Sequence, residues 1–215
     1  MIYKQQRNWE NLQRARFPGV GPYEIPELRP VRSIPDDLNW ISFNYARSCD
    51  ERSSHAVHFF VDDYQFNRVW TDPDKYTEML SEFAVVCTPD FSPYSDFPRA
   101  VQIWNHYRKH WVGAYWQMHG LLVIPTITWS DPSTLDWCFD GEPGGGIVAM
   151  SSVGMFLQEE YLRWLMQGYE QMMKKLAPIK IIWRGKIPPE LEPEREAGRI
   201  LQIPSFVDKW HENRK

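Results

Sequence analysis

The sequence predicts an α/β protein with about five mostly parallel strands in an open or partial-barrel-like sheet flanked by helices, and an extended, proline-rich N-terminal arm. Three observations lead to this prediction. From residue 56, short apolar runs alternate with longer amphipathic stretches, the pattern of β-α-β units around a parallel sheet buried on both faces. Five prolines lie within residues 17–36, which excludes a regular helix there. The chain has 215 residues, fewer than the roughly 250 typical of a complete eight-stranded barrel.

The predicted elements follow one another without an internal repeat. The expected strands are AVHFFV (56–61), AVVCT (84–88), LLVIPTIT (121–128), GIVAMS (146–151) and IKIIW (179–183). The amphipathic segments expected to form helices are 72–83, 98–120 and 156–176. A polar N-terminal helix is expected before the arm. We therefore expect residues 1–36 to form a helix and an arm packed on a single α/β domain of residues 37–215.

Composition limits the classes of function. The net charge of −4 argues against a general binder of nucleic-acid backbones, which normally carries a basic excess. Cys49, Cys87 and Cys138 are far apart and odd in number, which indicates neither a disulfide framework nor a thiolate zinc site. No segment has the length and apolar character of a membrane span or a signal peptide. We expect a cytoplasmic protein with no membrane partner.

The loops locate the expected site. Three connections that enter strands are only two residues long (EF, HG and AP), whereas those that leave strands are long, such as PDFSPYSDFP. In parallel α/β folds the ligand site lies at the carboxyl ends of the strands. The loop of residues 88–98, TPDFSPYSDFP, is therefore expected to form one wall of a site. Its three prolines restrict the backbone and hold acids and rings in fixed positions.

Carboxylates follow two of the expected strands. Asp62 and Asp63 follow the first, and Asp90 follows the second. Acids that lie together at the carboxyl ends of the strands can serve as general acid and base or hold a cation, so these three are our catalytic candidates. The alternative is a structural role, in which Asp62 or Asp63 starts a turn and Asp90 or Asp96 caps the helix that begins near Pro98.

Nine other side chains near strand ends are candidates for substrate binding. They are Asn44, Ser92, Tyr94, Arg99, Thr128, Trp129, Ser151, Ser152 and Arg184. Arg99 and Arg184 offer cations to an anionic group, and Trp129 offers a flat ring to a sugar or base. Ser151 and Ser152 precede a helix whose N-terminus could hold an anion. The structural alternatives are surface arginines, a tryptophan packed beneath its own loop, and helix caps.

The sequence requires no cofactor and predicts no metal site. His106 and His110 have the i, i+4 spacing at which two imidazoles can share a metal, but no glutamate completes an H-E-x-x-H pattern. The glycine-rich segment DWCFDGEPGGGI leads into an expected strand and is not followed by a helix. That order is wrong for a phosphate-binding loop or a dinucleotide fingerprint.

Seven motifs are distinctive as a set. They are WISFNYA, VHFFVDD, TPDFSPY, QIWNHYR…GAYWQMHG, LVIPTITW, CFDG and IVAMSSVG. Together these motifs, which span about residues 38–185, resemble those of the domain-of-unknown-function 4417 family of bacterial, phage and mobile-element proteins. The resemblance implies a phage or mobile-element origin, with the host cell cytoplasm as the expected location if the protein is phage-encoded, and it assigns no catalytic residues.

Three hypotheses of function stay open. The first is a hydrolase or transferase that acts on a glycosidic bond in a sugar- or nucleotide-containing substrate, with the acids at the strand ends transferring protons. The alternative is a non-catalytic factor that binds a nucleotide-like ligand or a host protein, such as an inhibitor of a host system. The third is nucleic-acid processing, which requires a set of arginines to gather on one face. These are Arg14, Arg16, Arg29, Arg32 and Arg47.

Overall fold

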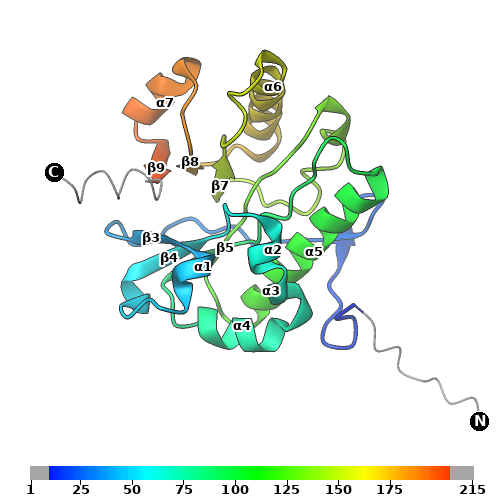
Figure 1. Cartoon of the computed structure of the whole chain (residues 1–215), viewed down its shortest axis with the longest axis vertical. Helices are drawn as coiled ribbons and strands as arrows, with labels where there is room; N and C mark the ends of the chain where they lie inside the picture. Colours follow the sequence, from blue (N-terminus) through cyan, green and yellow to red (C-terminus); the bar gives the residue numbers. More distant parts are fainter. Residues whose placement is uncertain (1–9, 204–215) are drawn as a thin grey trace, which may run out of the picture.

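Two parallel sheets form the framework of the protein (Figure 1). The structure is a computed structural model, and it describes residues 10–203. In spatial order, the first sheet contains β3 (Asn39–Ser42), β4 (His55–His58), β5 (Val85–Cys87) and β6 (Val123–Ile124). The second sheet contains β7 (Ile147–Ser151), β8 (Lys180–Arg184) and β9 (Ile200–Ile203). All pairings within these two sheets are parallel, which confirms the predicted α/β class.

The strands neighbour one another in the order in which they occur along the chain, as in a barrel. The two sheets are linked beyond β6, where Thr126 pairs with Ala149 in a parallel bridge and the Ile127 N–H donates to the Ala149 carbonyl at 2.8 Å. Ile182 of the second sheet belongs to the same apolar core as Trp40 of the first. The sheets therefore share one interior, and the strands of residues 10–203 do not close into a barrel.

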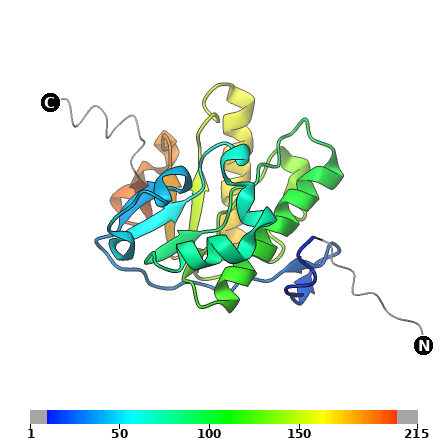
Figure 2. The same cartoon turned by 60° about the horizontal axis from the view of Figure 1, so that its bottom comes forward.

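Helices pack against both sheets. They are α1 (Phe43–Ala46), α2 (Asp63–Phe66), α3 (Arg68–Thr71), α4 (Pro73–Leu80), α5 (Arg99–Met118), α6 (Glu159–Leu176) and α7 (Glu192–Glu196). Within residues 10–203, three short 3-10 segments accompany these helices: η1 (Arg52–Ser54), η2 (Pro132–Thr134) and η3 (Pro189–Leu191). Figures 1 and 2 show α4 and α5 beside the first sheet and α6 beside the second. The buried residues of α6 form a separate apolar core with the outward-facing side chains of β7 and β8.

The two long helices begin and end where local chemistry favours it. Helix α5 starts directly after Pro98 and ends before Gly120, whose φ of 86° lies in the left-handed region that glycine adopts at low cost. Helix α6 has two glutamates in its first turn and Lys174 and Lys175 in its last turn. These charges complement the helix dipole.

The N-terminal arm runs along the domain and contains a short hairpin of β1 (Gly19–Val20) and β2 (Ile25–Pro26). Ile25 and Leu28 are buried, whereas Tyr23 is 42% exposed. The Leu28 N–H donates to the Gly141 carbonyl at 2.9 Å, so the arm contacts the loop before β7. The expected N-terminal helix lies mainly outside the described residues, and residues 10–14 form a turn.

Two strands, β3 and β9, were not expected from the sequence. Each has four residues and lies at an outer end of the strand order. Their sequences, NWIS and ILQI, contain polar residues and lack the continuous apolar run that marks a strand buried on both faces. Within residues 10–203, the cysteines form no disulfide, and no helix has the length and hydropathy needed to cross a membrane.

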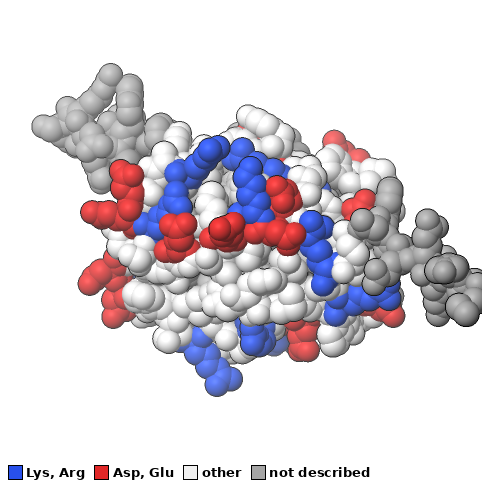
Figure 3. All heavy atoms as spheres, turned by 90° about the horizontal axis from the view of Figure 1, so that it is seen from below, with Lys and Arg blue, Asp and Glu red and all other residues white. Residues whose placement is uncertain are grey.

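Charges of both signs lie side by side on the face shown in Figure 3. Two of the arginines considered for nucleic-acid binding have partners within the protein. Arg14 forms an ion pair with Asp74 at 2.9 Å, and the guanidinium of Arg29 donates to the Gln117 carbonyl at 2.5 Å. The face in Figure 3 is not uniformly basic, as a surface for phosphate-backbone binding typically is.

Candidate functional site

The loop of residues 88–98 leaves β5 and is held by a carboxylate from the neighbouring strand-end loop. Asp63 accepts two hydrogen bonds from Ser92, one from the backbone N–H at 3.0 Å and one from the hydroxyl at 2.8 Å. Asn105 of α5 donates to the Ser92 carbonyl at 2.7 Å. Both carboxylate oxygens of Asp63 are thus engaged in positioning the loop. Asp62 is exposed at the N-terminus of α2.

Asp90 lies two residues before Ser92 and is only partly exposed. The Thr128 hydroxyl, which follows β6, donates to Asp90 Oδ1 at 2.6 Å. Burial raises the pKa of Asp90 to about 6; the Asp63 charge adds to this rise, while the Thr128 hydrogen bond and the Lys109 charge oppose it. Asp90 therefore exchanges its proton close to neutral pH.

A buried lysine, Lys109, lies close to the segments that follow β5 and β6. The Lys109 ammonium of α5 is 1% exposed and donates to the Glu142 carboxylate at 2.6 Å and to the Thr126 carbonyl at 2.9 Å. Thr126 is fixed in turn, because its hydroxyl donates to the Thr88 carbonyl at 2.8 Å. An ammonium group has three protons, and these two bonds use two of them.

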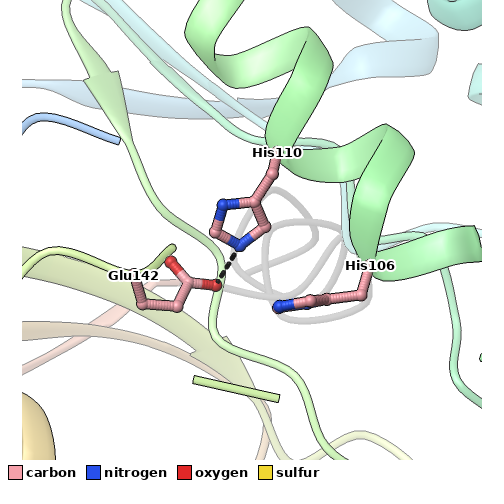
Figure 4. Close-up of side chains that lie close together, drawn as sticks. All are labelled: His106, His110 and Glu142. Carbon is pink, nitrogen blue, oxygen red and sulfur yellow. Dashed lines mark hydrogen bonds and ion pairs between the residues drawn. The ribbon is translucent and has the colours of Figure 1, made fainter. Parts of the chain in front are cut away.

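Two histidines of α5, His106 and His110, lie one turn apart, and both point toward Glu142 (Figure 4). His110 Nδ1 lies 2.8 Å from the Pro26 carbonyl oxygen, and its Nε2 lies 3.0 Å from Glu142 Oε1. His106 Nε2 lies 3.0 Å from the Asp140 carbonyl oxygen. Burial holds the pKa of His106 well below its usual range, and the nearby Lys109 charge acts in the same direction, so this ring is neutral.

A small cavity of about 10 Å³ connects the loop with this buried polar cluster. Its walls come from the loop of residues 88–98, from α5 and from the segments after β6. They are Phe91, Pro93, His106, Lys109, Thr128 and Trp137. The cavity is about the size that one water molecule needs. Thr128, which binds Asp90, therefore shares this space with the buried Lys109.

Arg99 and Trp129 both form hydrogen bonds to neighbouring segments of the protein. The Arg99 guanidinium is exposed and donates to the carbonyl and the hydroxyl of Ser133, both at 2.8 Å. The Trp129 indole N–H donates to the Trp164 carbonyl at 3.0 Å, and its ring packs against Gly168 of α6, where a Cβ would lie 2.0 Å from the ring. Trp129 is thus held against α6 through its indole N–H and its ring.

The candidates that follow β7 and β8 lie side by side, because Ser151 pairs with Arg184 in the parallel register. The Ser151 hydroxyl accepts from the Val153 N–H at 3.2 Å. Ser152 is buried, accepts from the Trp183 indole N–H at 3.1 Å and donates to the Lys186 carbonyl at 2.5 Å. These bonds give both serines a role in shaping the turn.

Asn44 and Tyr94 lie on the surface. Asn44 is exposed in α1, and its Oδ1 accepts from the Ser42 hydroxyl at 2.6 Å. Tyr94 is 53% exposed, and its ring contacts Phe97 edge-on. Of the predicted site residues, the structure brings Asp63, Asp90, Ser92 and Thr128 together through hydrogen bonds.

A larger cleft, of about 570 Å³, lies away from the strand-end loops. It is formed by the N-terminal segment and the first half of α5, and its walls are mainly apolar. They are Glu10, Leu12, Tyr23, Ala100, Ile103, Trp104 and Tyr107. We expected the strand-end loops to enclose the principal polar pocket; at that edge the structure has the small cavity of about 10 Å³ lined by Thr128, and the larger cleft lies elsewhere.

Lys109 and Glu142 were not among the site residues predicted from the sequence. The sequence does not mark Lys109 as buried, since its neighbours three and four positions away on α5 include the polar Asn105 and His106 as well as Val112. Glu142 lies in a turn-rich connection without periodicity and 33 residues from its partner Lys109. Only the fold brings the two together.

The fold and the site define an α/β protein with barrel-like strand order and a buried polar cluster beneath a strand-end loop. The chain belongs to the family described as "Domain of unknown function (DUF4417)", which matches residues 17–203. This match confirms the resemblance indicated by the sequence motifs.

Relatives of this chain are encoded by bacteriophages. The "Gene 1 protein" of Mycobacterium phage D29 is 38% identical over 196 residues, which cover 91% of this chain and 72% of that protein. The "Gene 1 protein" of Mycobacterium phage L5 is 36% identical over 200 residues, covering 92% of this chain and 86% of that protein. No solved structure matches the chain.

Proposed function

We propose that the protein is a phage or mobile-element enzyme in which Asp90 acts as general acid and base on a glycosidic bond of a sugar- or nucleotide-containing substrate. The observation that carries this proposal is the environment of Asp90, a partly exposed carboxyl at the end of a parallel strand whose pKa is raised to about 6. A carboxyl of this kind can protonate a leaving group and, once ionised, accept a proton from water.

The surrounding residues support the proposal through positioning. Asp63 holds the loop through Ser92, so in this proposal it orients Asp90 and does not serve as the second catalytic acid. Tyr94 is the exposed ring nearest in sequence and is available to stack on a sugar or base. Arg99, at the start of α5, offers a guanidinium to an anionic group such as phosphate. The host cytoplasm is the expected location, because nucleotide-containing substrates are present there.

A substrate panel tests the proposal. The wild-type protein, Asp90→Asn and Asp96→Asn are each incubated with nucleosides, nucleoside monophosphates and nitrophenyl glycosides, and the released base or nitrophenol is quantified by chromatography. Asp96 is a matched control because it is an exposed aspartate on the same loop. The proposal predicts turnover by the wild type and by Asp96→Asn, and a loss of about a hundredfold or more in Asp90→Asn. Equal turnover by all three proteins would contradict it.

A second candidate function is a non-catalytic factor that binds a host protein. It is favoured by large apolar side chains exposed after β4, β5 and β7. These are Tyr64 (80% exposed), Tyr94 (53%), Val153 (65%) and Leu157 (80%). Aromatic and aliphatic side chains of this kind form the centres of protein interfaces. If this function holds, Tyr64→Ser and Leu157→Ser abolish capture of a host protein that the wild type and Asp90→Asn both retain.

A further inference from the structure

Three buried side chains with metal-binding groups converge behind the loop. His106 and His110 come from adjacent turns of α5, and Glu142 comes from the turn-rich loop before β7 (Figure 4). One ligand atom from each side chain lies within 4.8 Å of the others, and all three residues are buried. Two histidines and one glutamate form a set that proteins use to bind Zn²⁺.

The hydrogen bond of His110 to the arm identifies which of its nitrogens is free. A carbonyl oxygen only accepts hydrogen bonds, so the Pro26 carbonyl at 2.8 Å requires the proton on Nδ1. In the neutral ring Nε2 then carries a lone pair, and it lies 3.0 Å from another acceptor, Glu142 Oε1. Two acceptors at this distance require either a proton shared between them or a metal ion beside them.

The carboxylate of Glu142 has one engaged and one unengaged oxygen. Oε1 receives both Lys109, at 2.6 Å, and His110. Oε2 is buried and has no hydrogen-bond partner among the described residues. A protonated His110 would place two cations on Oε1 and leave Oε2 without a partner, which is costly in a buried site. A metal ion bound to Oε2 and to His110 Nε2 would satisfy both atoms.

We propose that His106, His110 and Glu142 bind one divalent transition-metal ion, with Zn²⁺ as the ion that this ligand set favours. The site is independent of the acid–base role proposed for Asp90. His106 coordinates either through Nδ1 or by exchanging its hydrogen bond to the Asp140 carbonyl for the ion. The bond from His110 Nδ1 to Pro26 is the outer-shell contact that commonly fixes the orientation of a histidine ligand.

The backbone next to Glu142 is shaped for this arrangement. Gly141 has a φ of 77°, and a Cβ at this position would lie 2.7 Å from His110 Nδ1 and 2.6 Å from the Pro26 carbonyl oxygen. Only glycine therefore allows Glu142 to approach His110 so closely. Lys109 has the opposite effect on the ion, because its ammonium lies against the ligand carboxylate and repels a cation.

Metal content and affinity of the full chain test the proposal. The protein is expressed in medium supplemented with zinc or cobalt, its metal content is measured by mass spectrometry, and its Kd is obtained by competition with a chromophoric chelator. We expect about one metal ion per chain and, for Co²⁺, the visible absorption of a site with four or five ligands. His106→Gln should weaken binding at least about tenfold, as changes near metal ligands do.

Two further variants separate a metal site from a purely structural ion pair. Lys109→Met removes the competing ammonium and should tighten Zn²⁺ binding about tenfold or more, whereas an ion-pair network without a metal predicts no binding in this variant. His119→Gln is the control, because His119 is an exposed histidine at the end of the same helix. Circular dichroism confirms that each variant is folded. Absence of bound metal in both the wild type and Lys109→Met, or equal Kd values for His106→Gln and His119→Gln, would overturn the proposal.

Discussion

Replacing Asp90 by asparagine should change the pH dependence of stability in a defined direction. The pKa of Asp90 is raised from 3.8 to about 6 in the folded protein, mainly by burial. At low pH the carboxyl is neutral in the folded and unfolded chains alike. As the pH rises through the folded pKa, the folded chain must accommodate a buried charge, so the stability that the bound proton provides is lost. Asparagine cannot titrate and does not show this loss.

The magnitude follows from the size of the rise in pKa. A rise in pKa from 3.8 to about 6 lowers the free energy of unfolding by at most about 3 kcal/mol between low pH and high pH. Because Asp90 is partly exposed, solvent reduces this figure, and we expect about 2 kcal/mol. The Asp63 and Lys109 charges act on Asp90 in opposite directions, so changing either residue would shift the same curve.

Urea denaturation followed by tryptophan fluorescence measures this effect, since the chain has 11 tryptophans. The free energy of unfolding of Asp90→Asn, relative to the wild type, should rise by about 2 kcal/mol from about pH 3 to about pH 7 and then remain constant. Asp96→Asn serves as the control for a change of charge on the same loop. A difference between Asp90→Asn and the wild type that does not vary with pH would refute the reasoning.

Three other substitutions test the packing around the site, each by urea denaturation. Asp63→Ala removes both hydrogen bonds to the loop after β5 and should lower the free energy of unfolding by about 1–3 kcal/mol. An unchanged urea midpoint would mean that the loop holds its shape without these bonds. Gly168→Ala should destabilise by about 1–3 kcal/mol despite the better helix propensity of alanine, because the new Cβ meets the Trp129 ring, and a stabilised variant would contradict this packing. Glu142→Leu should lower the free energy of unfolding by about 3–5 kcal/mol, because Lys109 is left buried without a carboxylate. An unchanged free energy of unfolding would show that the Lys109–Glu142 ion pair contributes little to stability.

The fold could be predicted from the sequence where burial leaves a continuous pattern. The runs at 84–88 and 146–151 contain β5 and β7, because strands covered on both faces are apolar throughout. The strands at the ends of the order, β3 and β9, carry no such pattern. Their sequences mix polar and apolar residues, and each pairs with one strand of its sheet.

The site was predictable in part for the same reason. Parallel topology places the ends of β5 and β6 at one edge, so the proximity of Asp90 and Thr128 follows from the strand order. The sequence does not indicate that Asp63 would use both oxygens to hold Ser92. Such pairings depend on side-chain geometry that periodicity does not encode.

The proposed chemistry depends most directly on the proton of Asp90, and nuclear magnetic resonance can follow that proton without a known substrate. The carboxyl carbons of aspartate are labelled with ¹³C, and their shifts are recorded over a range of pH in the wild type and in Asp90→Asn, so that the signal missing from the variant is that of Asp90. We predict that this signal titrates with a pKa of about 6. A pKa near 3.8, the ordinary value for aspartate, would contradict the assignment of Asp90 as a general acid and base at neutral pH.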